Sequence, residues 1–333
     1  MAGIKEIAKI TGVSLATVSR VFNDSPLVSP KTREKVLKAA KELDYRPNMM
    51  AAALRSGKSK IIGVIVPEVN NSFFSDIING IERVVSDSGF NIIISQTHEQ
   101  QEKEISALDS FMKLNVDGVL MSISKETTDY GHIQKLIDGK IPIVFFDRPP
   151  SLERINTVVL DNYLGAYIAT EHLIHNNCKT LLHIAGDSEV SIFKERKKGF
   201  LAAVQKYKTD SVSHQILELK SDTEQDVKNL KNLFKENPNI DGIFAFGDEM
   251  AIHVLNLLNT LNIEVPSKIK LIGFGNANFS TLTQPTISSI DQENALMGEL
   301  SANLLLQNMD KQKRPSTRIL SPKLIARESS KTN

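Results

Sequence analysis

A short segment near the start of the chain carries side chains that could read a nucleic acid. It combines one guanidinium, short hydroxyl and amide groups, and two apolar side chains: Leu15, Ala16, Thr17, Ser19, Arg20 and Asn23. Arginine can donate two hydrogen bonds to a guanine edge, and apolar groups can pack on thymine methyls. Hydroxyl and amide groups suit phosphate oxygens, which position a protein on DNA. The segment predicts double-stranded DNA as a partner, although Leu15 could instead continue the core stripe of its helix.

Other residue groups give little support for catalysis. Gly273-Phe274-Gly275 resembles part of a dinucleotide-binding loop, but the third glycine is missing. His172 and His175 have no carboxylate or cysteine at ligand spacing, and the one cysteine excludes an internal disulfide. No apolar run reaches the roughly 18 residues of a membrane span, and the start has no signal-peptide core. We expect a cytoplasmic protein with no enzyme activity, metal, cofactor or membrane partner.

Three short helices are expected to position the candidate DNA-reading residues. Apolar spacing predicts a first helix over residues 4–11, ending at a glycine. Ser14 is a suitable N-cap for a second helix that runs to about Phe22. Ser29-Pro30 supplies a cap and a first-turn proline for a third helix that runs to about Leu43. This is the pattern of a helix-turn-helix, whose second helix enters the major groove.

The charge distribution agrees with this interpretation. Residues 1–60 contain twelve Lys and Arg against five Asp and Glu, a net charge of +7 in a chain whose total is +1. The remaining residues therefore carry −6. A basic head on an acidic body gives an attractive face for phosphate, although a solvated basic surface would look the same.

From residue 61 onward, short apolar runs alternate with helical stretches. The runs predict buried parallel strands at 61–66, 92–95, 118–121, 141–146, 181–184, 243–246 and 271–274. The clearest intervening helices are expected at 76–88, 163–175, 194–206 and 250–261. The fold class is therefore α/β, with doubly wound parallel sheets behind an all-α head. Some 270 residues exceed one compact sheet, so we expect two lobes with a cleft between them.

Several runs of the sequence are similar to the lactose/galactose-repressor (LacI/GalR) family. They include "IKEIAKITGVSLATVSRVFN", "VSPKTREKVLKAAKELDYRPN" and "ALRSGKSKIIGVIVP" in the first 67 residues, and "VVLDNYLGAYIATEHLI", "GDEMAIHVLNLL" and "QPTISSIDQ" later. The resemblance implies base contacts by Leu15, Ala16 and Arg20. It also implies a hinge helix at about 47–58, in which Leu54, beside Arg55, wedges into the minor groove.

The resemblance implies a sensor similar to periplasmic sugar-binding proteins, with its lobes joined by three crossovers. The head with its hinge would span 1–60. The N-terminal lobe would comprise 61–160 and 290–320, and the C-terminal lobe 161–289 and 321–333. A family-like ending without a leucine-heptad tail predicts a dimer and not a tetramer.

Residues of an effector site can be assigned by position in this resemblance. They are Asn70, Phe73, Phe74, Asp147, Arg148, Arg196 and Asp248. Core packing of the two phenylalanines and a local Asp147–Arg148 ion pair are the alternatives. Two positions depart from the family: Gly275 stands where an aspartate often binds ligand, and Gly247 where an asparagine often does.

The sequence thus predicts a transcription regulator, most simply a repressor, which binds a palindromic operator as a homodimer under control of a small-molecule effector. The effector would be a carbohydrate or a sugar-derived metabolite. A solute-binding transport component would share the sensor fold, but it would need an export signal and no DNA-binding head. The two glycines leave open a regulator of the same architecture that ignores effectors or answers to a protein partner.

Overall fold

The computed structural model describes residues 3–22, 25–45, 58–207, 212–219, 224–310 and 314–331. The chain divides into two compact units, the head (Met1–Ser59) and the cleft domain (Lys60–Asn333). Each unit is described by itself.

The head contains the three expected helices. They are α1 (Ile4–Thr11), α2 (Leu15–Phe22) and α3 (Pro30–Glu42). Both predicted caps are present: Ser14 Oγ accepts from the Thr17 backbone N–H at 3.1 Å, and Ser29 Oγ accepts from that of Thr32 at 3.3 Å. The three helices enclose a small core of Ile7, Val18, Val21, Val36, Ala39 and Ala40. The serine caps satisfy backbone donors that a helix leaves free at its start.

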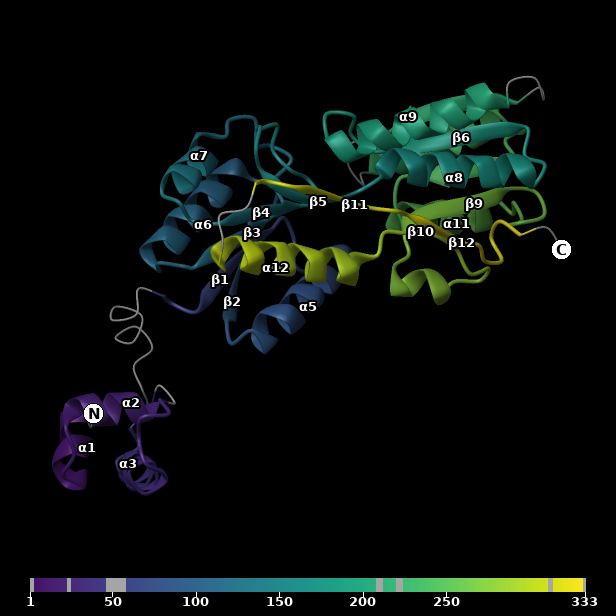
Figure 1. Ribbon diagram of the computed structural model, residues 1–333. Helices are drawn as coiled ribbons and strands as arrows, with labels where there is room; N and C mark the ends of the chain where they lie inside the picture. The colour runs from purple at the N-terminus through teal and green to yellow at the C-terminus, as the bar shows by residue number, and fades with distance from the viewer. Residues whose placement is uncertain are drawn as a thin grey trace. The chain divides into compact units, whose positions relative to one another are not determined.

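The first lobe of the cleft domain is built on a six-stranded parallel sheet (Figure 1). Its strands are β1 (Ile61–Val66), β2 (Asn91–Gln96), β3 (Gly118–Met121), β4 (Ile143–Phe146), β5 (Asn156–Leu160) and β11 (Thr317–Leu320). Their order is β11-β5-β4-β3-β1-β2. The helices of this lobe are α5 (Ser72–Asp87), α6 (Gln101–Lys113), α7 (Gly131–Asp138) and α12 (Asn294–Asp310). Helices α5 and α12 pack together, as do α6 and α7.

The second lobe repeats this plan with one antiparallel edge strand. Its strands are β6 (Thr180–Ala185), β7 (Ser213–Glu218), β8 (Gly242–Ala245), β9 (Lys270–Gly275), β10 (Ser288–Asp291) and β12 (Lys323–Ile325), in the order β12-β10-β9-β8-β6-β7. Only β12 runs antiparallel, against β10. The helices are α8 (Asn162–His175), α9 (Ser191–Lys206), α10 (Glu224–Glu236), α11 (Asp248–Thr260) and the short η2 (Asn278–Thr281).

The chain passes between the lobes three times. The passages follow β5, β10 and β11, so each sheet contains strands that are distant in sequence. Strand β11 completes the first sheet by pairing with β5, where Thr157 Oγ1 donates to Thr317 Oγ1 at 3.0 Å. Strand β12 then completes the second sheet.

The predicted fold class is confirmed, while several element boundaries differ. Helix α5 begins at Ser72, four residues before the predicted start, because Asn71 Oδ1 accepts from the Phe73 backbone N–H at 2.9 Å. Phe73 and Phe74 consequently lie in the first turn of a helix. Within the part of the chain that the structure describes, no helix is long and apolar enough to cross a membrane.

Candidate functional site

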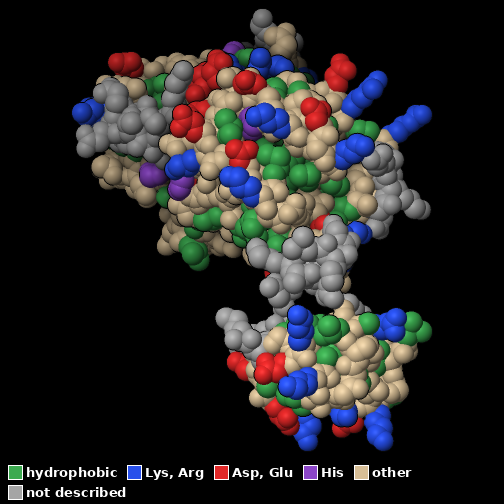
Figure 2. All heavy atoms as spheres, turned by 90° about the vertical axis from the view of Figure 1, so that its left-hand side faces the viewer, with side chains coloured by type: hydrophobic (Ala, Val, Ile, Leu, Met, Phe, Trp, Pro, Cys, Tyr) green, Lys and Arg blue, Asp and Glu red, His purple; other side chains and the backbone are tan. Residues whose placement is uncertain are grey.

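Helix α2 presents most of its predicted DNA-reading residues at the surface of the head. Val18 and Val21 are buried in the core, whereas Leu15 is 45% exposed and Ala16 and Arg20 are exposed. Leu15 is therefore not a core residue of the head. Figure 2 shows Lys and Arg side chains projecting from the visible face of this unit. The predictions for Asn23, Leu54 and Arg55 lie outside the described residues.

A cavity of about 640 Å³ lies in the cleft domain at the carboxyl ends of strands from both sheets. All seven predicted effector residues line it. Parallel sheets commonly bind ligands at this edge, because the loops that follow neighbouring strands converge there. The structure thus brings together residues that are up to 178 positions apart, from Asn70 to Asp248.

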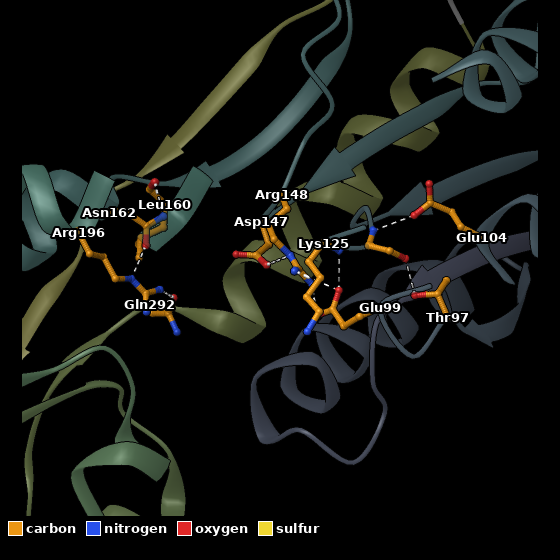
Figure 3. A network of polar contacts seen from close by, with 11 residues as sticks. Thr97, Glu99, Glu104, Lys125, Asp147, Arg148, Leu160, Asn162, Arg196 and Gln292 are labelled. Atoms are coloured by element: carbon orange, nitrogen blue, oxygen red, sulfur yellow. Dashed lines mark hydrogen bonds and ion pairs between the residues drawn. The ribbon is translucent and has the colours of Figure 1, made fainter. Parts of the chain in front are cut away.

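The wall from the first lobe is built around Arg148, whose main partner is Glu99. Its Nη1 and Nη2 donate to the two Glu99 carboxylate oxygens at 3.2 and 2.9 Å (Figure 3). The predicted contact with Asp147 is present but longer, 3.6 Å from Nε to Oδ2. Asp147 has a left-handed backbone (φ 58°). Burial raises the pKa of Asp147, and the charges of Arg148 and Arg196 oppose this rise.

A buried glutamate behind this wall holds the loop that follows β3. Glu104 accepts hydrogen bonds from the Ser124 backbone N–H at 2.7 Å, from Thr127 Oγ1 at 3.1 Å and from His132 Nε2 at 2.7 Å. The next backbone N–H, that of Lys125, donates to Glu99 at 2.7 Å. The loop therefore fixes the carboxylate that binds Arg148 (Figure 3).

Arg196 on α9 forms the centre of the opposite wall and is only 5% exposed. Its Nε donates to Asn162 Oδ1 at 2.9 Å and its Nη2 to Gln292 Oε1 at 3.2 Å (Figure 3). Its Nη1 donates to the Phe246 carbonyl at 2.6 Å. The guanidinium lies 3.6 Å from the centre of the Phe274 ring. Burial lowers the pKa of Arg196 to about 9, so the group stays charged at neutral pH.

Asp248, the first residue of α11, organises the loop after β9. Its Oδ2 accepts from the Ala277 backbone N–H at 2.7 Å, and its Oδ1 accepts from Ser289 Oγ at 2.5 Å. Burial raises the pKa of this carboxyl, and the two hydrogen bonds counteract the rise. Both oxygens are already engaged, so Asp248 lines the cavity while it holds the wall in place.

The first lobe also contributes Asn70, Phe73 and Phe74 to the lining of the cavity. Asn70 is exposed and Phe73 is partly buried, whereas Phe74 is 6% exposed and belongs to the hydrophobic core. The two rings meet edge to face, 5.0 Å apart. Phe74 therefore packs in the core and lines the cavity at the same time.

Sequence reasoning missed several residues of the cavity. The polar ones with a clear role are Glu99, which binds Arg148, and Gln292, which binds Arg196. Further phenylalanines line the second wall, namely Phe193, Phe246, Phe274 and Phe279. Glu99 follows β2, so searching the chain just after that predicted strand would have found it. Gln292 follows β10, a strand that the apolar runs did not predict.

A helix-turn-helix head combined with a cleft between two parallel sheets defines a regulator that binds DNA and has a separate ligand-binding domain. Residues 3–48 match the model of bacterial regulatory proteins of the lacI family, and residues 62–313 match a periplasmic binding protein domain. The chain belongs to the lacI family of bacterial regulatory proteins. It is a transcriptional repressor of this type and not an enzyme.

Relatives match over nearly the whole chain. A ribose operon repressor of Halalkalibacterium halodurans is 31% identical over 332 residues, covering 99% of this chain and 98% of that protein. Catabolite control protein A of Priestia megaterium is 31% identical over 310 residues, 93% of each chain. A complex of the transcriptional regulator CelR with cellobiose is 26% identical, covers 99% of this chain and 100% of that one, and has a TM-score of 0.73. The lac repressor dimer bound to operator, at 22% identity, 99% coverage of both chains and a TM-score of 0.87, shares the fold.

Proposed function

We propose that the protein represses transcription as a homodimer on a palindromic operator, and that a neutral carbohydrate bound in the cleft changes its affinity for that operator. One helix-turn-helix reads half of a two-fold site, which calls for two copies. Some of the relatives support a carbohydrate: two are ribose operon repressors, and a similar structure holds cellobiose, whereas several others are PurR repressors.

The main support for a neutral effector is the charge of the residues that line the cavity. Among the residues that the structure describes, three cations line it, Lys125, Arg148 and Arg196, against five carboxylates: Glu99, Asp147, Asp187, Asp248 and Glu249. Arg148 is already bound by Glu99, and the donors of Arg196 are largely used within the protein. A phosphate or carboxylate ligand would meet an excess of like charge. Hydroxyl groups can donate to carboxylates, and the C–H faces of a sugar ring can pack on phenylalanine rings.

A thermal-shift screen of the full chain tests this proposal. The panel contains neutral mono- and disaccharides, uronic acids, sugar phosphates and nucleobases. A ligand at 100 times its Kd adds about 2.7 kcal/mol to stability, which gives a readable rise in Tm. We expect a hit among the neutral sugars and none among the charged analogues of the same sugar.

Two outcomes would contradict the proposal. Tighter binding of a sugar phosphate than of its neutral parent would show that the charge argument is wrong. A blank panel would favour the alternative regulator that has lost effector response or is controlled by a protein partner.

For the head, we propose that α2 reads base edges through Leu15, Ala16 and Arg20, and that Thr17, Ser19 and Asn23 contact phosphates. Leu54, with Arg55, would wedge into the minor groove at the centre of the operator. The wedge would kink the DNA, which costs base-stacking energy but allows more contacts between protein and DNA. Closure of the cleft would change operator affinity by about 1–3 kcal/mol, a range typical of allosteric coupling.

Arg20→Ala is expected to relax base preference at one position in each half-site, at a cost of about 1–3 kcal/mol. The reason is the loss of a bidentate donor pair from an exposed position on α2. Selection from a randomised operator library measures the preference. Lys38→Ala, which removes an exposed charge from α3, is the control and should keep the selected sequence. If the base preference of Arg20→Ala were unchanged, Arg20 would not be a base-reading residue.

A further inference from the structure

Gly247 is a glycine that neither its backbone nor its packing requires. It precedes α11 with φ −159° and ψ 163°, an extended conformation open to every residue type. A Cβ atom built there would have one neighbour within 4 Å, the Phe274 carbonyl oxygen at 3.8 Å. Gly247 also lines the cavity, so a side chain at this position would enter open space.

Gly275, the other glycine of the same wall, has a different explanation. Its φ of 131° lies where side chains are rarely tolerated. A Cβ atom there would be 3.6 Å from both Asp248 Oδ2 and Gln292 Nε2. The positive φ therefore explains why residue 275 is a glycine. At position 247 the backbone does not require glycine, and the missing side chain leaves open space in the cavity.

Three apolar residues lie near this room. Phe246 precedes Gly247, Phe274 approaches it through its carbonyl, and Met250 lies one helical turn further along α11; all three line the cavity. Phe193 packs edge to face on Phe246, with ring centres 5.2 Å apart. The first-lobe wall holds the polar groups around Arg148, whereas the second-lobe wall combines these aromatic rings with charged groups such as Arg196 and Asp248.

We infer that Gly247 determines specificity by making room for a second ring, so that the effector is a neutral saccharide or glycoside of at least two rings. One ring presents hydroxyls to the carboxylates and guanidinium groups. The other places its C–H face over Gly247, against the partly exposed ring of Phe246. This inference rests on the proposed function, because it refines the class of effector bound in the same cleft.

Gly247→Asn tests the inference by filling the room without disturbing the fold. Asparagine at this N-cap position can accept a backbone N–H of α11, so the Tm of the free variant should equal or slightly exceed that of the native chain. Calorimetry on the full chain would use cellobiose, maltose, lactose and sucrose, and their component monosaccharides. We expect at least one disaccharide to bind more tightly than its components. Gly247→Asn should weaken disaccharide binding at least tenfold, because its side chain takes the space of the second ring. The component monosaccharide should bind this variant at least as tightly as it binds the native chain, because an asparagine here can still contact a single ring.

Gly247→Ser is the matched control. It can also cap α11 but adds little bulk, so it should weaken disaccharide binding less than threefold. If a monosaccharide binds as tightly as any disaccharide, and Gly247→Asn leaves its affinity unchanged, the inference fails while the proposed function stands. If none of these sugars binds, the inference fails, and a blank thermal-shift panel as well would mean that the proposed function fails with it. A lower Tm of free Gly247→Asn would show that the position is not open and would overturn the inference.

Discussion

Arg196→Lys should weaken effector binding at least 100-fold and abolish the response of operator binding to effector. A lysine keeps the positive charge but has three donors on one flexible atom. It cannot reproduce the planar fork that reaches Asn162, Phe246 and Gln292 together. The contact with the Phe274 ring is weakened as well. Because acceptors are left unpaired in a buried site, we also expect the free energy of unfolding of the cleft domain to fall by about 2–3 kcal/mol.

Titration with the sugar found in the thermal-shift screen measures the affinity, and operator binding with and without that sugar measures the response. Lys198→Gln on the same helix is the control, since Lys198 is exposed and pairs only with Glu195 among the described contacts. Operator binding without sugar should survive in both variants, because the head is a separate unit. An Arg196→Lys affinity within threefold of the native value would show that Arg196 is structural only.

His183 should make the cleft domain unstable in mild acid. The ring lies on β6 between those of Phe244 and Phe200, 4.7 and 5.0 Å away, and its Nδ1–H donates to the Phe244 carbonyl at 3.0 Å. Burial lowers its pKa to about 4. Between pH 6.5 and 4 the unfolded chain therefore binds a proton at this site that the folded chain rejects. Stability due to this group is complete above pH 6.5 and falls by about 3 kcal/mol as the pH drops to 4.

His183→Phe keeps an aromatic ring between the other two and removes the titration. We expect a modest cost of about 1–2 kcal/mol at pH 7.5, from the Phe244 carbonyl that loses its donor, together with a weaker loss of stability toward pH 4. Urea unfolding at a series of pH values gives both quantities. His253→Gln, which removes an exposed histidine from α11, is the control and should retain the His183-dependent loss. If His183→Phe and the native chain had identical profiles of stability against pH, the loss of stability in acid would not be due to His183.

The secondary-structure elements that depend on local patterns and helix caps could be predicted from the sequence. Ser14 and Ser29 mark the starts of α2 and α3 because a serine before an apolar stripe satisfies free N–H groups. Apolar runs predicted β1 to β4, β6, β8 and β9 but missed β5, β7 and β10 to β12. The family resemblance pointed to cavity-lining residues such as Arg196. The direction of Leu15 could not be predicted, because its helical spacing fits both the core stripe and the surface.

Contacts between distant segments could not be predicted. Nothing near Glu99 in sequence indicates that it binds Arg148, because the pair forms only when β2 and β4 enter one sheet. Local sequence patterns also do not predict that β11 pairs with β5. The early start of α5 depended on one side-chain cap, Asn71, which shifted Phe73 and Phe74 from the expected loop onto a helix.

The late position of β11 and β12 in the chain has a consequence for biosynthesis. Each strand completes one of the two sheets, so the first lobe lacks its last described strand until residue 320 has been synthesised and the second lobe until residue 325. The helices of the head are complete by residue 42. At about 5–20 residues per second, the ribosome needs roughly 15–55 seconds to cover the distance between them. A nascent chain thus carries finished DNA-reading helices well before it can respond to a signal, which makes assembly of the sensor the step that turns a DNA-binding chain into a regulated one.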